Sequence, residues 1–430
     1  MENNLKLKLF IFLCLISFNK DLFSQNFDKY FKNNTLRINY YHCGKQNNEK
    51  IYINDYYVDT TWSGPKNNLI YPFIYGDYFV KVYDTISNEV IYSYGFCTLF
   101  REYQTTLEAK SIEKCFRETI KIPFPKSTVK IELLSRDSLG KFNVIYESNF
   151  NPKKEIIKTE NLSKIKSYPV YSSGKYNEKL DITFISEGYT KDNIKEYNKY
   201  VKNISAKLLQ AMPFSENKND INIWSVEAIS EENGSDFMYG YNNKVVNTAL
   251  NSNFYTFGTD RYVTTEDYWS VAKYASVVPS DIVCVIVNSD VYGGGGIFNF
   301  YAIYSANADY DFVVLIHEIG HLIAGLADEY YTSETAYVNF YPLNIEPWSS
   351  NITTMVDFKS KWADMLEKNT PIPTPANYNK IGAYEGGGYS PKGIYRSMLK
   401  CYMKDLNAKG FCPVCEKTIV DLIKYYSDKK

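Results

Sequence analysis

Short segments in which apolar and polar residues alternate fill the chain from residue 26 to about residue 150. "TLRINYY", "KIYINDYYV", "YFVKVYDT" and "TVKIELL" follow this pattern, and turn residues separate them. Alternation with a period of two is typical of strands that bury one face. A succession of short strands of this kind predicts a β-sandwich over residues 26–150.

From residue 180 onward the pattern changes to strands that alternate with helices. The apolar runs "LDITFISEGY", "INIWSVEAI" and "SDIVCVIVNS" predict buried strands. Between the first two, "TKDNIKEYNKYVKNISAKLLQAM" has helical periodicity, with Thr190 as the expected N-cap. We therefore expect an α/β domain over residues 180–430, a polar linker at 151–179, and a mixed α+β fold for the whole chain.

The first 25 residues have the layout of a secretory signal peptide. Lys6 and Lys8 precede an apolar run from Leu9 to Phe18. That run is too short to span a bilayer, so we expect residues 1–25 to direct export, to the periplasm, the cell surface or the medium. No other stretch is long and apolar enough to predict a membrane span.

Charge and cysteine content narrow the function further. The net charge of −1 gives no basic footprint for nucleic acid. Of the eight cysteines, Cys14 lies in the signal segment, which leaves seven, an odd number. Cys401, Cys412 and Cys415 cluster near the C-terminus, and "CPVC" could form half of a zinc site. No second CxxC completes such a site, and export favours a structural disulfide there.

The segment "YDFVVLIHEIGHLIAG" carries the clearest chemical signal. It has helical periodicity, and Gly325 is placed to end the helix. His317 and His321 are two of only three histidines in the chain, and their spacing puts both on one helix face. Both imidazoles can then reach one zinc ion, while Glu318 can take a proton from a water beside it. Two packed histidines are the alternative, but a chance HExxH is rare where histidine is so scarce.

A third ligand has to be a carboxylate, because the remaining histidine, His42, lies far away in the β-rich half. If the chain turns back at Gly325, Asp328 can complete a tetrahedral site and leave the fourth position to water. A ligand on a later helix, in a thermolysin-like arrangement, is the alternative. For Glu329 and Tyr330 we expect ordinary loop roles.

Two further segments fit a zinc peptidase. The run "YGGGGIFNF" includes three glycines that we predict to form a strand binding the substrate as an added strand: Gly294, Gly295 and Gly296. A flexible glycine loop explains the same run equally well. Met403 in "CYM" is predicted to form a methionine turn under the zinc ligands, as in metzincins, although a methionine filling a core gap is the plainer account. Tyr395 and Tyr402, nearby in sequence, are candidates for holding the oxyanion.

These segments together resemble the IgA-peptidase family of secreted bacterial zinc metallopeptidases. The similar stretches are "DITFISEGYT", "INIWSVEAISEENGSDF", "YGGGGIFN", "HEIGHLIAGLADEY" and "GFCPVCEKTI", in that order across residues 180–420. "YGFCTLFREYQTT" resembles the N-terminal domain of members from gut bacteria. The resemblance implies a metzincin-like domain with His317, His321 and Asp328 as zinc ligands and Glu318 as the base. Gly325 stands one residue beyond the glycine of the metzincin pattern.

We therefore expect an exported zinc-dependent endopeptidase with about one Zn²⁺ per chain, acting on a polypeptide or glycoprotein. The alternatives are an exported binding or adhesion protein with a structural zinc domain, and a zinc amidase acting on cell-wall peptides. Structural zinc sites are usually closed by four Cys or His ligands. Three ligands beside an intact Glu318 leave an open position, which favours an enzyme.

Overall fold

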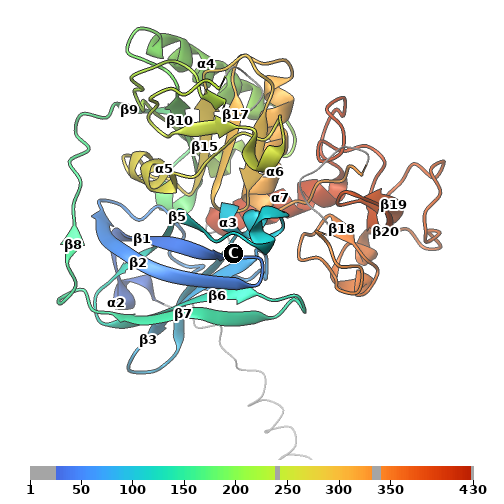
Figure 1. The fold of residues 1–430 in the computed structure, drawn as a ribbon. Coiled ribbons are helices and arrows are strands. Elements are labelled where there is room, and N and C mark those ends of the chain that lie inside the picture. Colours follow the sequence, from blue (N-terminus) through green and yellow to red (C-terminus); the bar gives the residue numbers. More distant parts are fainter. Residues whose placement is uncertain (1–25, 238–242, 332–339, 428–430) are drawn as a thin grey trace, which may run out of the picture.

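The computed structural model describes residues 26–237, 243–331 and 340–427, so the predicted signal peptide, 1–25, lies outside the described residues. The described chain has a β-rich N-terminal half and a C-terminal half of mixed helices and strands (Figure 1). The mixed α and β fold class expected from the sequence is confirmed at this level.

Two four-stranded sheets build the N-terminal half, in the orders β5-β1-β2-β8 and β4-β3-β6-β7. Alternate apolar residues of both sheets meet in one core, for example Leu36 and Ile38 from one sheet and Val80 and Val82 from the other. The period-two pattern is what produces this shared core. The elements are α2 (Phe27–Tyr30), β1 (Phe31–Lys45), β2 (Asn48–Asp59), β3 (Tyr78–Asp84), β4 (Val90–Phe96), α3 (Leu99–Gln104), β5 (Lys114–Pro125), β6 (Val129–Arg136), β7 (Phe142–Phe150) and β8 (Ile157–Lys158).

A six-stranded sheet organises the C-terminal half, in the order β16-β17-β15-β10-β11-β9. Its four central strands, β17, β15, β10 and β11, are parallel, and an antiparallel strand closes each edge. Every residue of β15 is buried, as its continuous apolar run predicts. The sheet strands are β9 (Ser167–Tyr171), β10 (Leu180–Glu187), β11 (Ile221–Val226), β15 (Ile282–Val287), β16 (Gly294–Ile297) and β17 (Tyr301–Ser305).

Four α-helices and two small sheets complete the described part of this half. The helices are α4 (Ile194–Leu208), α5 (Tyr268–Ala275), α6 (Asp311–Ala324) and α7 (Pro413–Tyr426). The small sheets contain β12 (Asp236–Phe237), β13 (Ser252–Phe254) and β14 (Thr264–Thr265), and β18 (Ile352–Thr353), β19 (Tyr384–Gly387) and β20 (Ser390–Arg396). The last of these sheets lies to one side, next to α7 (Figure 1).

Two expectations about local structure need correction or refinement. Helix α4 begins at Ile194 after Asn193, so Thr190 is not its N-cap. The reason is local: the Asn193 side chain accepts hydrogen bonds from the amide and hydroxyl of Thr190, which forms a turn ahead of the helix. The predicted linker, 151–179, contributes β8 to the first N-terminal sheet and β9 to the six-stranded sheet.

The two halves are joined through a common core. Phe100, Tyr103 and Phe116 of the N-terminal half belong to the same buried cluster as the six-stranded sheet and α6. Polar bonds cross the same junction: the Cys97 amide donates to the Phe298 carbonyl at 2.9 Å, and the Trp348 indole donates to Asp77 at 3.0 Å. The N-terminal half is therefore fixed against the residues around α6.

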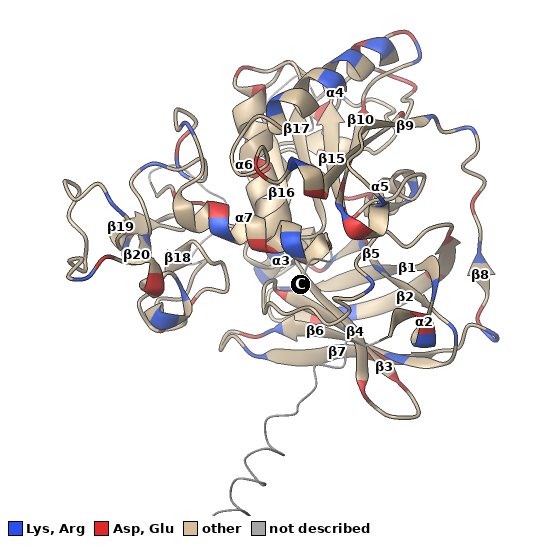
Figure 2. Ribbon diagram, turned by 180° about the vertical axis from the view of Figure 1, so that it is seen from behind, with Lys and Arg blue, Asp and Glu red and all other residues tan. Residues whose placement is uncertain are grey.

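Charged residues are dispersed over both halves. Figure 2 shows Lys and Arg interspersed with Asp and Glu, as the net charge of −1 suggests. Among the residues that the structure describes, no helix combines the length and the apolar character needed to cross a membrane.

The third histidine of the chain, His42, forms a buried polar cluster within the N-terminal half. Its ring nitrogens lie 3.0 Å from Glu118 Oε2 and 3.0 Å from Glu49 Oε2, and its ring stacks on Phe100. Burial opposes the charge on His42 and on Glu49, but the opposite charges of their neighbours and the hydrogen bonds outweigh it. The pKa of His42 is therefore raised, and that of Glu49 is lowered to about 2.

We predict that His42→Ala lowers the free energy of unfolding by about 3–5 kcal/mol, because it leaves buried carboxylates without their partner. Glu49, whose pKa falls from 4.5 to about 2 on folding, contributes stability above pH 4.5 that is lost toward pH 2. His42, whose pKa is raised from 6.5, contributes below pH 6.5 and loses this as pH rises further. Denaturant unfolding measured across pH should show the largest difference in the free energy of unfolding between wild type and His42→Ala from about pH 4.5 to 6.5. A difference independent of pH would contradict the charge assignment.

Candidate metal centre

Helix α6 ends where the glycine signal predicted. Gly325 adopts a left-handed conformation with φ of 57°, and its amide donates to the His321 carbonyl at 2.9 Å. The Leu326 amide then donates to the Gly320 carbonyl at 3.3 Å. A left-handed C-cap of this kind turns the chain away from the helix axis, and glycine adopts it without strain.

Buried hydrogen bonds hold the segment after this turn. Asn351, which is fully buried, accepts from the Ala327 amide and donates to the Ala327 carbonyl, both at 2.8 Å. The Gly388 amide donates to the Asp328 carbonyl at 2.8 Å. With its backbone fixed at both positions, the segment runs back alongside the helix and carries Asp328 to the two histidines.

The structure brings His317, His321 and Asp328 together. Asp328 Oδ1 lies 3.1 Å from His317 Nε2 and 3.3 Å from His321 Nε2, and the two Nε2 atoms are 3.1 Å apart. Tetrahedral zinc with ligand bonds of about 2.0 Å separates its ligand atoms by about 3.3 Å. Asp328 Oδ1 is buried and makes no hydrogen bond to any described residue. The three donors and this unsatisfied oxygen fit a zinc ion.

The outer atoms of all three residues are fixed by further bonds. His317 Nδ1 bonds to the Tyr402 carbonyl at 2.9 Å, and His321 Nδ1 bonds to the Leu326 carbonyl at 2.5 Å. Each Nδ1 therefore carries the proton, which leaves Nε2 as the lone-pair donor. The Tyr389 hydroxyl donates to Asp328 Oδ2 at 2.5 Å. Only the atoms facing the centre remain for a metal.

The electrostatics of the three residues favour positive charge between them. Burial disfavours a charged imidazole, but the Asp328 carboxylate outweighs it and raises the pKa of His321 to about 9. Burial likewise opposes the charge on Asp328, yet the two histidines hold its pKa well below the ordinary value. A carboxylate so strongly held in its charged form is a suitable ligand for a divalent cation.

Glu318 lies beside this group without belonging to it. It projects from the same helix as His317 and is 8% exposed. Burial raises its pKa, while the positive potential of His317 and His321 opposes the rise. Its carboxylate, with this raised pKa, lies next to the candidate metal position.

The glycine run forms strand β16, the outermost strand of the six-stranded sheet, and packs against Glu318. A methyl group added at Gly294 would lie 2.5 Å from Glu318 Oε1, and one at Gly296 would lie 2.6 Å from the Glu318 carbonyl. The close approach expected of these glycines is therefore present. Part of the outer edge is paired, because Gly294 exchanges backbone hydrogen bonds with Arg261 and Val263. In the alternation of an antiparallel strand, Gly296 is the next residue to face outward.

Met403 lies under α6, where a methionine turn would be expected. It is fully buried, and a methyl group added at Gly320 would lie 2.7 Å from its sulfur. Its carbonyl accepts from the Glu329 amide at 2.8 Å. The neighbouring Tyr402 lines the cavity over the metal centre. Tyr395, which lies in β20 and pairs with Thr353 of β18, is not among the lining residues.

A cavity of about 1300 Å³ opens over these residues. His317, Glu318 and Gly296 form part of its floor, and α3 and the turn at residues 46–47 between β1 and β2 contribute to its wall. Several lining residues near the metal centre were not indicated by the sequence motifs: Arg261, Tyr292, Tyr330 and Tyr389. Tyr330 ends the stretch "HEIGHLIAGLADEY", where an ordinary loop role was expected, but its ring stacks on that of His317 with the centroids 6.5 Å apart. No local pattern marks Tyr389 or Asn351, which the fold brings in from distant segments.

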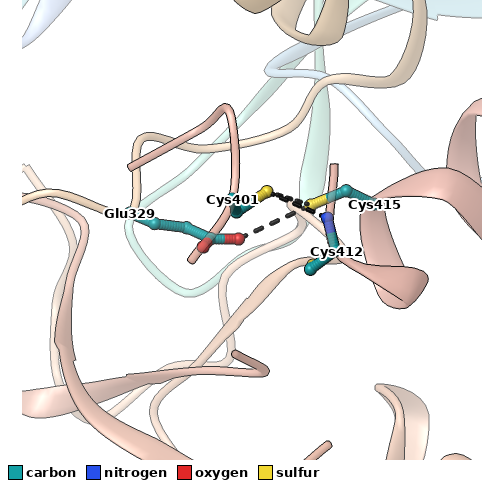
Figure 3. Close-up of side chains that lie close together, drawn as sticks. All are labelled: Glu329, Cys401, Cys412 and Cys415. Atoms are coloured by element: carbon teal, nitrogen blue, oxygen red, sulfur yellow. Dashed lines mark hydrogen bonds between the residues drawn. The ribbon is translucent and has the colours of Figure 1, made fainter. Parts of the chain in front are cut away.

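A second cluster lies close by and corrects two expectations. The described chain has one disulfide, Cys43–Cys115, so the disulfide expected in "CPVC" is not formed and the three C-terminal cysteines are thiols. Glu329 is not an ordinary loop residue, because it is fully buried and its carboxylate faces these thiols (Figure 3). The cluster comprises Glu329, Cys401, Cys412 and Cys415.

Comparison with protein families covers nearly all of the described chain. A family model described as IgA Peptidase M64 matches residues 168–381 and 376–423. A second, described as Peptidase M64 N-terminus, matches residues 26–147. No curated protein matches the chain in sequence.

We predict that Gly296→Ala destabilises the protein by about 1–3 kcal/mol, because the new methyl group would lie 2.6 Å from the Glu318 carbonyl and 3.0 Å from His321 Cβ. Either β16 or α6 must shift, so the affinity for zinc should fall as well. Gly410→Ala is the matched control, since a methyl group there meets nothing within 4 Å. Thermal unfolding and zinc titration compare the two variants. Equal behaviour would contradict the packing of β16 against the metal helix.

Proposed function

The chain belongs to the IgA Peptidase M64 family, and from this we propose that it is an exported, zinc-dependent endopeptidase. Membership makes it a metallopeptidase that acts on a polypeptide. The identity of the metal, the roles of the residues and the export are our additions. One observation carries the metal and the residue roles: three donor atoms of His317, His321 and Asp328 face a common centre at tetrahedral separations, with Glu318 alongside.

His317, His321 and Asp328 are the proposed zinc ligands. Zinc held there would polarise the scissile carbonyl and acidify the attacking water. The ligands occupy three positions and leave the side toward the cavity open, as catalytic zinc sites require. The carbonyls of Tyr402 and Leu326 fix both imidazoles in the tautomer that presents Nε2 to the metal.

Glu318 is the proposed general base. It takes a proton from the attacking water and passes it to the leaving amine. Its place on α6 keeps the carboxylate one residue away from a ligand, and the glycines of β16 leave room for it. Tyr330 and Arg261 line the same cavity, and the Arg261 guanidinium lies 5.5 Å from the centre of the Tyr330 ring. Both are placed to stabilise negative charge on the substrate.

The substrate is proposed to lie along β16 as an added strand, over Gly294, Gly295 and Gly296. Because the outward groups of Gly294 already bond to Arg261 and Val263, Gly296 supplies the main contact. The neighbouring wall from the N-terminal half would contact residues on one side of the scissile bond. A cavity of about 1300 Å³ has room for several residues of a polypeptide or glycoprotein.

A metzincin-like architecture is part of the same proposal. A glycine turn after the HExxH helix, a third ligand just beyond it, and Met403 packed beneath the helix support it. Export is supported by the signal-like pattern of residues 1–25 and by the Cys43–Cys115 disulfide, since disulfides persist in oxidising compartments.

We predict that His317→Ala, His321→Ala and Asp328→Ala each lower the zinc content by about one ion per chain, because two protein ligands rarely hold zinc firmly. Elemental analysis after extensive dialysis measures the loss. Tyr395→Phe, at a residue that does not line the cavity, is the control. If the three variants keep as much zinc as the control, the ligand assignment is wrong.

We predict that Glu318→Ala keeps its zinc and its fold but cleaves about 10²–10⁴-fold more slowly, because only the base is lost. Cleavage of an unfolded protein or peptide library should be compared with wild type at matched zinc content. Wild-type cleavage that survives undiminished in Glu318→Ala would defeat the mechanism. Absence of cleavage by wild type would favour a binding protein with a structural zinc domain, and release of cell-wall peptides instead would favour the amidase alternative.

A further inference from the structure

The second cluster, Glu329 with Cys401, Cys412 and Cys415, gathers four potential metal ligands from three separate segments. One ligand atom from each residue lies within 4.8 Å of all the others, and all four residues are buried. Cys412 and Cys415 stand at the start of α7, Cys401 lies two residues before Met403, and Glu329 follows Asp328 directly. Figure 3 shows the sulfur atoms of Cys401 and Cys415 facing the carboxylate.

The measured separations match the edges of a tetrahedral zinc site. Cys401 Sγ and Cys415 Sγ are 3.7 Å apart, and Cys415 Sγ lies 3.5 Å from Glu329 Oε1. With Zn–S bonds of about 2.3 Å and Zn–O bonds of about 2.1 Å, a tetrahedron has S···S edges of about 3.8 Å and S···O edges of about 3.6 Å. A disulfide would require the sulfurs to approach to about 2.05 Å.

The number of thiols and the buried carboxylate also favour a metal over a disulfide. A disulfide can join only two of the three thiols and would leave the third buried beside the Glu329 carboxylate. Glu329 Oε2 is itself buried and makes no hydrogen bond to any described residue. A buried carboxylate left unsatisfied is costly, whereas a cation bound to all four residues compensates it.

We propose that Glu329, Cys401, Cys412 and Cys415 bind a second, structural zinc ion. The thiols bind as thiolates and release their protons to solvent on binding. All four coordination positions are then filled by the protein and buried, which is the closed arrangement of structural zinc sites. This site therefore takes no part in hydrolysis, and the expected content rises from one zinc per chain to two.

The surroundings provide the supporting contacts that a charged metal site needs. The Cys412 amide donates to Cys401 Sγ at 3.2 Å, Ser397 Oγ lies 3.1 Å from Cys412 Sγ, and Asn351 Nδ2 donates to Glu329 Oε1 at 3.0 Å. The buried guanidinium of Arg396 places positive charge near Glu329. These groups offset the net negative charge of three thiolates and a carboxylate around a divalent ion.

The position of the cluster gives the second ion a structural task. It would tie the segment after Gly325 to the Cys401–Met403 segment and to the first turn of α7. The Glu329 amide already bonds to the Met403 carbonyl, and the adjacent Tyr402 carbonyl holds His317. Metal at the cysteines would thus keep both Asp328 and His317 at their places beside the first centre.

The test separates the second site from the first by removing the first. In His317→Ala/His321→Ala, elemental analysis should find about one zinc per chain, and X-ray absorption should show sulfur ligands. Cys412→Ser and Cys415→Ser in that background should lose this ion, whereas Cys284→Ala, at a buried thiol outside the cluster, should keep it. Peptidase activity plays no part in these measurements, so their outcome is independent of the proposed function.

Two further measurements on the His317→Ala/His321→Ala protein test the second site even if the cysteine variants fail to fold. Co²⁺ exchanged into it should give the intense absorption of cobalt–thiolate bonds. Alkylation in denaturant with chelator and without reductant should label Cys401, Cys412 and Cys415 in full. A double histidine variant free of metal, zinc with only nitrogen and oxygen ligands, or a disulfide between any two of the three cysteines would overturn the proposal.

Discussion

The turn at Gly325 is the constraint on which the metal centre depends. A helix that continued past this point would carry Asp328 about 10 Å along its axis from His321. The left-handed conformation reverses the chain within one residue, and a side chain there would collide with Trp348, since an added methyl group lies 2.4 Å from its ring. Glycine is thus required both by the backbone conformation and by the packing around it.

Once the chain has turned, fixed backbone bonds rather than side-chain carboxylates orient the histidines. His321 Nδ1 bonds to the carbonyl of Leu326, just after the turn, and His317 Nδ1 bonds to the carbonyl of Tyr402, next to Met403. Asn351 bonds to both the amide and the carbonyl of Ala327, and so holds the segment between Leu326 and Asp328. The geometry of the centre therefore depends on how three chain segments are held together, and this is why the neighbouring cysteine cluster, which joins the same segments, matters to it.

The sequence predicted those features that local chemistry determines. The HExxH spacing, the glycine stop and the scarcity of histidine were enough to predict that Asp328 lies beside the two histidines. Period-two alternation indicated the β-rich half. What failed depended on long-range packing. A single CxxC with no second copy favoured a disulfide, because nothing local shows that Cys401 and Glu329 arrive beside it from other segments. Asn351 and Tyr389 carry no motif for the same reason.

The N-terminal half packs against the candidate site and is not a separate appendage. Phe100 and Phe116 bury themselves in the core that also contains α6, so the two halves cannot separate without exposing apolar surface. The Cys97 amide bonds to Phe298, one residue beyond β16, so the β-rich half pins the end of the strand that packs on Glu318. Its loops in turn form one wall of the cavity. Under the proposed placement of the substrate along β16, a rigid junction at this place would restrict which polypeptides can lie over Gly296, and the fit between the two halves would contribute to substrate selectivity together with the metal centre.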